Sequence, residues 1–290
     1  RQEKVTISRS CFVAENLMSE RRVLFIVEGK RGEPRFLQRM HQVLFGTKVE
    51  NIYSYETVVY DLLERMFPKG YDDEGLDVVS VLREKETDDN LRAMLAKEFS
   101  DVYLVFDMDP HHQKYNRRLL EKAVNFFDDS TVNGKLYLNY PMLESYKHLK
   151  MHNDAEYLHR IVGMDRDALR RYKSVVDSEC DKDFRQLEKY TEETFVEIIR
   201  LNLCKTNNIL NSDSTLPDVD SYLAWNGNDI LSEQERMMDS EGRVYVLNTS
   251  SFIPVDYSPS RFCRSDSRSH SVQSSRRMIP FHSTLSIQSR

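Results

Sequence analysis

The sequence contains the stretch Val23-Leu24-Phe25-Ile26-Val27-Glu28-Gly29-Lys30. Five consecutive apolar residues, rich in β-branched types and followed by a turn residue, are typical of a short strand buried on both faces. The glycine allows the chain to turn sharply directly after the strand. Glu28 is therefore expected where strand becomes loop, at the carboxyl edge of a parallel sheet, which is the edge where open α/β sheets bind ligands.

A second apolar run, residues 102–106, leads directly into Asp107-Met108-Asp109. Residues i and i+2 of a strand share a face, and two neighbouring carboxylates repel each other unless a cation lies between them. Together with Glu28 they would offer three oxygen ligands, and Mg²⁺ (or Mn²⁺) binds carboxylates together with water and phosphate oxygens. The sequence thus predicts a divalent metal site. The alternative is a solvated turn at Asp107–Asp109 and a surface acid at Glu28.

Two charged residues of the glycine loop are further candidates. Lys30 could hold a phosphate or stabilise a leaving oxygen, or it could be a solvated loop lysine. Glu33 could contact the same metal ion, although an acid in the first turn of a helix is equally explained by the helix dipole.

Three residues near the later strand ends are accessory candidates. His111 and His112 follow Asp109-Pro110 and could act as acid–base groups or contact substrate, or they could simply be exposed. Glu144 follows a strand ending at Tyr140-Pro141. It could join the carboxylate cluster or lie in the first turn of a helix.

Strand and helix patterns alternate along the first half of the chain. Strands are expected at residues 23–27, 51–59, 102–106 and 135–140, with helices at 36–44, 62–67, 88–99, 115–127 and 142–146. No helix is expected before Pro34, and residues 78–82 fit either a strand or the start of a helix. Such alternation predicts βαβ units and a mostly parallel sheet flanked by helices in an α/β fold.

The expected organisation has three parts. Residues 1–150 form the α/β catalytic domain, beginning with an arm or short helix over residues 1–20. Residues 151–257 form a C-terminal helical module, without a strand signal over 154–210 and with a helix at 225–238. A returning strand is a candidate at 243–247, which 251–257 could extend. Residues 258–290, with 11 serines and six arginines, are expected to be a flexible tail because they cannot bury enough apolar surface.

Composition narrows the class of protein. The 290 residues are 40% hydrophobic and 30% charged, which suits a chain with a substantial core. No apolar run approaches the roughly 18 residues of a membrane span, so no membrane association is expected. The four cysteines form no CxxC pair, which favours a reducing, cytoplasmic location. A net charge of −6 means that nucleic acid would be bound by local basic patches or metal ions.

The strand-end motifs Val27-Glu28-Gly29-Lys30 and Phe106-Asp107-Met108-Asp109 resemble those of the TOPRIM domain, a Rossmann-like fold of topoisomerases, primases, ribosomal RNA maturases and OLD nucleases. The resemblance covers roughly residues 20–150. It implies metal-dependent phosphoryl transfer by Glu28, Asp107 and Asp109. Many OLD-like members carry a second acid about four residues after the first glutamate, whereas Glu33 lies five residues on.

Residues 138–146, Leu-Asn-Tyr-Pro-Met-Leu-Glu-Ser-Tyr, are similar to the small OLD-like TOPRIM proteins of phage defence, such as the effector family of the PARIS system. That resemblance implies an endoribonuclease of host tRNA, homodimeric when active and restrained by a separate ABC-type ATPase until a viral trigger arrives. The absence of a GxxxxGK[ST] motif agrees with an ATPase supplied by another chain.

The leading hypothesis is therefore a Mg²⁺-dependent nuclease with Glu28, Lys30, Asp107 and Asp109 as catalytic residues. Two alternatives remain open. The fold could be a non-catalytic binding or regulatory subunit whose helical region, residues 154–240, contacts a partner, or it could be a DNA nuclease of OLD type. A primase-like or topoisomerase-like enzyme is less favoured, because the chain lacks the companion domains of those enzymes.

Overall fold

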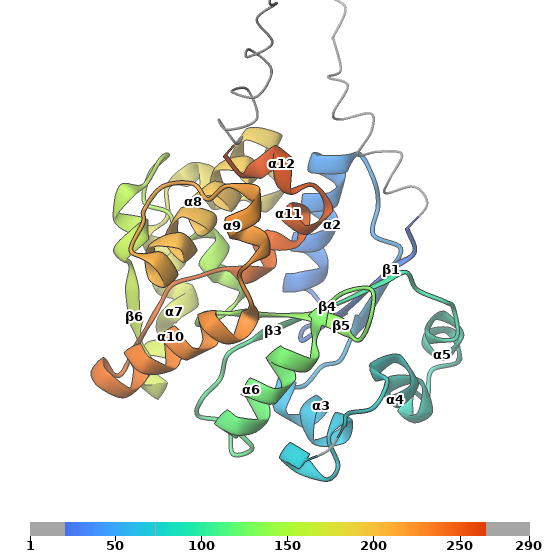
Figure 1. The fold of residues 1–290 in the computed structure, drawn as a ribbon. Helices are drawn as coiled ribbons and strands as arrows, with labels where there is room; N and C mark the ends of the chain where they lie inside the picture. The colour runs from blue at the N-terminus through green and yellow to red at the C-terminus, as the bar shows by residue number, and fades with distance from the viewer. Residues whose placement is uncertain (1–20, 73, 265–290) are drawn as a thin grey trace, which may run out of the picture.

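The computed structural model describes residues 21–72 and 74–264, in which a five-stranded sheet is flanked by helices (Figure 1). The strand order is β2-β1-β3-β5-β4. Four strands are parallel and the short β4 is antiparallel to β5. The strands are β1 (Val23–Val27), β2 (Asn51–Ser54), β3 (Asp101–Asp107), β4 (Asp128–Asp129) and β5 (Gly134–Asn139). The expected α/β class with a mostly parallel sheet is confirmed.

Strand β1 lies between β2 and β3 and has the predicted bounds. Its residues Leu24 to Val27 are completely buried, as expected for an apolar run covered on both faces. Val27 is in register with Ser54 of β2 and Val105 of β3. The residues that follow these three strands therefore emerge side by side at one edge of the sheet.

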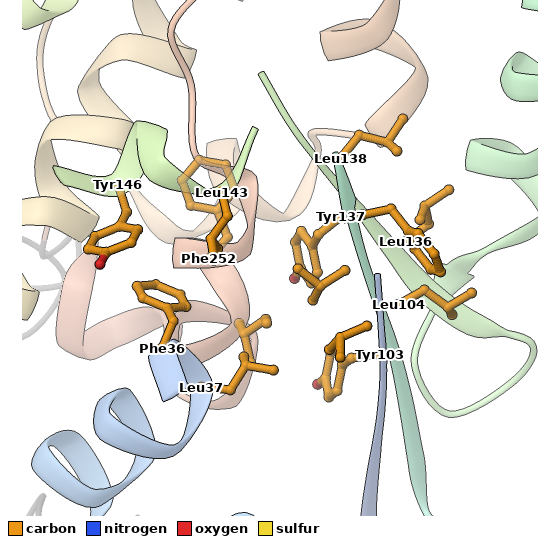
Figure 2. Packing of buried hydrophobic residues seen from close by; sticks show 14 of the residues in the cluster. Phe36, Leu37, Tyr103, Leu104, Leu136, Tyr137, Leu138, Leu143, Tyr146 and Phe252 are labelled. Carbon is orange, nitrogen blue, oxygen red and sulfur yellow. The ribbon is translucent and has the colours of Figure 1, made fainter. Parts of the chain in front are cut away.

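Helices cover both faces of the sheet (Figure 1). Helix α2 lies on one side together with α8 (Glu192–Asn211), α11 (Ile253–Tyr257) and α12 (Pro259–Phe262). Helices α3 and α6 lie on the other side, where α10 (Gly227–Glu241) packs against α6. Figure 2 shows the corresponding alternation, with Tyr103 and Tyr137 pointing toward α2 and Leu104 and Leu136 pointing away from it. The helices of this half are α2 (Gly32–Phe45), α3 (Val59–Met66), α4 (Val78–Lys85), α5 (Asp89–Leu95) and α6 (Arg117–Phe126).

The structure corrects some local expectations in this half. Helix α2 begins at Gly32, two residues before Pro34, so the proline lies inside the first turn, where its missing N–H is not needed. Residues 78–82 begin a helix, which Asp77 caps by accepting a hydrogen bond from the Ser80 backbone N–H. The segment after Pro141 forms a 3₁₀ turn, η2 (Leu143–Lys147), in place of an α-helix.

The second half of the chain is mostly helical, with a short second sheet. Its longer helices are α7 (Arg166–Glu179), α8 (Glu192–Asn211) and α10 (Gly227–Glu241), and its shorter ones are α9 (Val219–Leu223), α11 (Ile253–Tyr257) and α12 (Pro259–Phe262). The 3₁₀ turns are η3 (Ala155–His159), η4 (Lys182–Phe184), η5 (Leu187–Lys189) and η6 (Thr249–Phe252), with η1 (Gly70–Asp72) in the first half. Strands β6 (Ile161–Gly163) and β7 (Arg243–Tyr245) pair antiparallel.

Three expectations for this half need correction. A strand, β6, does occur within residues 154–210, where none was expected. The strand near residues 243–247 exists, but it pairs with β6, and residues 251–257 are helical. The expected tail begins with ordered structure, because α12 buries Phe262 completely. The rest of that tail, residues 265–290, and the expected arm at residues 1–20 lie outside the described residues.

Buried hydrogen bonds of Asn248, called the polar seam below, join the C-terminal segment to the main sheet. The Asn248 side-chain amide donates to Asn139 Oδ1 at 3.0 Å and to the Leu143 backbone oxygen at 3.1 Å. Its Oδ1 accepts from the Ser251 backbone N–H at 2.9 Å and from Ser250 Oγ at 3.1 Å. Asn248 is fully buried, so these bonds replace its lost contacts with water.

In the described ranges 21–72 and 74–264, none of the helices combines the length and the apolar composition needed to cross a bilayer.

We predict that Asn248→Ala lowers the free energy of unfolding by about 2–4 kcal/mol, because several buried partners lose their hydrogen bonds together. Urea denaturation followed by circular dichroism measures this change. Asn90→Ala, at an exposed position in α5, is the matched control and should change stability by no more than about 0.5 kcal/mol. Equal effects of the two substitutions would contradict a structural role for the seam.

Candidate active site

Parallel pairing of β1 and β3 brings Glu28 and Asp107 into direct contact. The Glu28 backbone N–H donates to the Val105 oxygen at 3.1 Å, which extends the ladder past the end of β1. The Glu28 side chain then curls over β3, and its Oε2 accepts from the Asp107 backbone N–H at 3.1 Å. The predicted meeting of the first glutamate with the aspartate strand therefore takes place at the carboxyl edge.

Glu33 is held against the loop that follows β1. It lies in the first turn of α2, and its side chain is buried. A Cβ placed on Gly29 would lie 2.7 Å from Glu33 Oε2, so the absence of a side chain at Gly29 makes room for this carboxylate. Burial and the charge of Glu144 raise the pKa of Glu33.

Glu144 and Lys173 complete the cluster from the C-terminal side. Asp107 Oδ1 accepts from the Leu143 backbone N–H at 2.8 Å, which places η2 and its Glu144 beside the aspartate. Glu144 Oε1 lies 3.0 Å from Lys173 Nζ of α7. The other oxygen of Glu144, Oε2, is buried without a hydrogen-bond partner.

The cluster shifts the protonation of its own carboxyl groups. Burial, together with the charges of Glu33 and Asp109, raises the pKa of Glu28 to about 7. Burial and the charge of Glu28 raise the pKa of Asp107 well above its ordinary value. Lys173 opposes both shifts, yet both pKa values remain raised. Burial is the largest cause of both shifts, so the charged forms of these acids are disfavoured here, and a bound cation would offset that cost.

The other predicted site residues have separate partners. Asp109 acts on Glu28 through its charge, while its Oδ1 accepts from the His111 backbone N–H at 3.0 Å. Lys30 Nζ pairs with Glu56 Oε2 at 2.7 Å in an exposed ion pair. His111 Nε2 contacts the backbone oxygen of Met164, and the His112 ring stacks on that of Tyr60.

The structure thus brings together Glu28, Glu33, Asp107 and Glu144, with Asp109 near enough to act on Glu28. Lys173 was not predicted from the sequence. It lies on a charged helix far along the chain from Asp107, and its charge pattern matches that of a solvated helix face. The packing of α7 against η2 places it here.

The donor set fits a hard divalent cation in type. Carboxylate oxygens are what Mg²⁺ prefers, and it commonly takes one or two protein carboxylates with water and substrate oxygens. Glu28 and Asp107 supply that number, and Glu144 Oε2 is a buried oxygen that lacks a partner. Within residues 21–72 and 74–264, however, no group of three or more acidic, histidine or cysteine side chains converges on one point as a metal site.

Comparisons with protein-family models, with curated proteins and with solved structures find no match for this chain.

We predict that Glu28→Gln stabilises the fold at pH 8 in the presence of EDTA. A glutamate with a native pKa of about 7, against 4.5 for its ordinary value, holds its proton more tightly when folded. Its contribution to stability is fully present below about pH 4.5 and is lost as pH rises through 7. Removing the charge should therefore raise the free energy of unfolding at pH 8 by on the order of 1–3 kcal/mol.

Chemical denaturation at pH 5 and pH 8 measures this difference. At pH 5 the variant and the wild type should differ much less, because Glu28 is then largely protonated in the native state. Glu84→Gln, at an exposed position in α4, is the control and should show no such pH dependence. A Glu28→Gln protein that is less stable than wild type at pH 8 would contradict the raised native pKa of Glu28.

Proposed function

We propose that this chain is a metal-dependent nuclease of the TOPRIM type that hydrolyses phosphodiester bonds. The contact between Glu28 and Asp107 carries the proposal. It joins the two strand-end motifs that resemble those of TOPRIM domains, at the edge of the sheet where α/β folds bind ligands. Raised carboxyl pKa values at such an edge are typical of functional sites.

The residues of this chain have distinct proposed roles. Glu28 and Asp107 would hold Mg²⁺ or Mn²⁺, with Asp109 and Glu144 adding negative charge around them. The bound ion would supply Lewis-acid neutralisation of charge on the scissile phosphate. Lys173, whose ammonium reaches Glu144 from α7, would contact a phosphate oxygen that enters the cluster. Lys30 is paired with Glu56, so a phosphate would have to displace that ion pair to reach it.

The proposed substrate and biological setting rest on the resemblance to TOPRIM effectors of phage defence. On that resemblance, the protein would be a toxic endoribonuclease that cuts host tRNA and acts as a homodimer. An ABC-type ATPase would restrain it until it is triggered. The mostly parallel sheet of the chain is compatible with that resemblance. A DNA nuclease of OLD type would use the same residues, and the assay below distinguishes RNA from DNA.

We predict that the purified protein cleaves nucleic acid in Mg²⁺ or Mn²⁺ and that EDTA abolishes cleavage. Glu28→Gln and Asp107→Asn should each lower the cleavage rate at least about 100-fold, because each would remove one charged ligand of the metal ion that neutralises the scissile phosphate. Gel analysis of tRNA, single-stranded RNA and duplex DNA measures the rate. Glu84→Gln, with its exposed acid in α4, is the control and should cleave like wild type.

Lys173 was found from the structure and Lys30 was predicted from the sequence, so variants of the two lysines test which one takes part in cleavage. We predict that Lys173→Met lowers cleavage at least tenfold, whereas Lys30→Met lowers it less, because Lys173 contacts the carboxylate cluster and Lys30 contacts Glu56. The same gel assay measures both variants. Wild-type activity in Glu28→Gln would overturn the assignment of the site, and the reverse order for the lysines would overturn the role of Lys173.

A non-catalytic binding subunit is the second candidate, and one observation favours it. Among the described residues, no three acidic, histidine or cysteine side chains come together as ligands of one metal ion. Lys173 already offsets part of the negative charge of the cluster. In that case the protein would form a stable complex with a partner chain through residues 154–240. It would cleave neither RNA nor DNA under any divalent cation, and Glu28→Gln would leave the complex intact.

A further inference from the structure

A cavity of about 340 Å³ lies beside β5, apart from the carboxylate cluster. Its lining comes from β5, from α6, from the junction of α9 and α10, and from the segment around η6. That volume is within the range of pockets that bury small ligands. None of the predicted catalytic residues lines it.

The cavity lies beside the middle of β5, where no strand of the described residues pairs with the outer edge of β5. Strand β4 pairs with the start of β5 at Gly134 and Lys135, and Tyr140 makes an antiparallel bridge to Leu247. Between these two contacts, Thr249 Oγ1 donates to the Leu138 backbone oxygen at 2.7 Å. The Leu136 backbone N–H donates to the Phe127 oxygen at 2.9 Å, so residues 136–138 of β5 line the cavity with their side chains and with an edge that is partly paired.

Three aromatic rings form one wall. The ring centroids of Tyr222 and Trp225 are 5.6 Å apart, and each of these rings lies within 6.4 Å of the Phe252 ring. The indole Nε1 of Trp225 is buried and has no hydrogen-bond partner. Because buried donors are almost always paired, an acceptor on a ligand that reaches this N–H would supply the missing partner. Leu223, which is 63% exposed, adds an apolar rim.

Hydrogen bonds to Asp256 gather the polar groups on one side of the cavity. Lys135 Nζ lies 2.8 Å from Asp256 Oδ1, and Tyr222 donates to the same oxygen at 2.6 Å. Tyr137 donates to the other oxygen of Asp256. Asp128 also lines the cavity and is exposed, so the lining carries two acids and one lysine and disfavours an anion. The cavity offers hydrogen-bonding groups and aromatic rings that are inclined to one another by 52° to 79°.

We propose that this cavity binds a nucleobase. A base presents a flat π-face to the aromatic wall, and its ring nitrogens and carbonyl oxygens can accept from an indole N–H. Stacking on aromatic side chains together with a few polar contacts is how proteins hold unpaired bases. The base could come from a free nucleoside or from single-stranded nucleic acid. This proposal does not rest on the nuclease activity, because the cavity shares no residue with the carboxylate cluster.

Trp225 is the one tryptophan of the 290-residue chain, so intrinsic fluorescence reports directly on this wall. We predict that at least one of adenosine, guanosine, cytidine and uridine, or a short single-stranded RNA, changes the Trp225 emission in a saturable way. Titration of the full chain in EDTA measures this without cleavage. Saturation by nucleosides identifies a free ligand, and saturation by RNA alone identifies a base within a strand.

Three variants test the location. Ala224→Phe adds a ring at an exposed position of the lining and should weaken binding at least tenfold, whereas Asp220→Phe, exposed on α9 and outside the lining, should bind like wild type. Trp225→Phe keeps an aromatic ring but loses the N–H, and calorimetry should show weaker binding. Glu28→Gln should bind like wild type, which separates this proposal from the nuclease proposal.

Two outcomes would overturn the proposal. One is the absence of a saturable change in fluorescence, and of heat in calorimetry, with every nucleoside and the RNA. The other is undiminished binding by Ala224→Phe in a protein whose circular dichroism matches wild type, because the ligand would then occupy another site.

Discussion

The burial of two neighbouring carboxyl groups at the ends of β1 and β3 is the constraint on which the candidate site depends. Parallel pairing fixes Glu28 beside Asp107 whatever their charges, since the ladder places the two strand ends side by side. Burial then removes the water that would screen them, and the pKa values of both acids rise. The fold therefore favours the protonated form of both acids, and ionising them in the native state costs free energy.

The C-terminal half positions the groups that act on these two acids. Asn248 ties the chain after β7 to Asn139 of β5, and Asn139 is in register with Asp107. The same amide contacts the backbone of Leu143, the residue before Glu144. The polar seam thus fixes η2 against the strand ends, and α7 packs on η2 with Lys173 at the cluster. The site is built from both halves of the chain.

The sequence predicted what short-range patterns determine. The bounds of β1, the parallel sheet and the contact of Glu28 with the Asp107 strand follow from an apolar run that ends in a turn. The pairing of β6 with β7 could not be predicted, because three-residue strands carry almost no periodicity and their stability comes from tertiary packing. Lys173 was missed for a related reason, since only the packing of α7 distinguishes it from the other charged residues of that helix.

A purely structural role explains the carboxylate cluster less well than a functional role does. The Lys173 side chain is 63% exposed, so its ion pair with Glu144 contributes little to the stability of the fold. The pKa values of Glu28 and Asp107 stay raised by burial although Lys173 acts on both, so ionising these acids still costs free energy. Glu144 also keeps a buried oxygen without a partner. Carboxyl groups with raised pKa values cluster at functional sites, and the proposed cation would offset the cost of ionising these two acids.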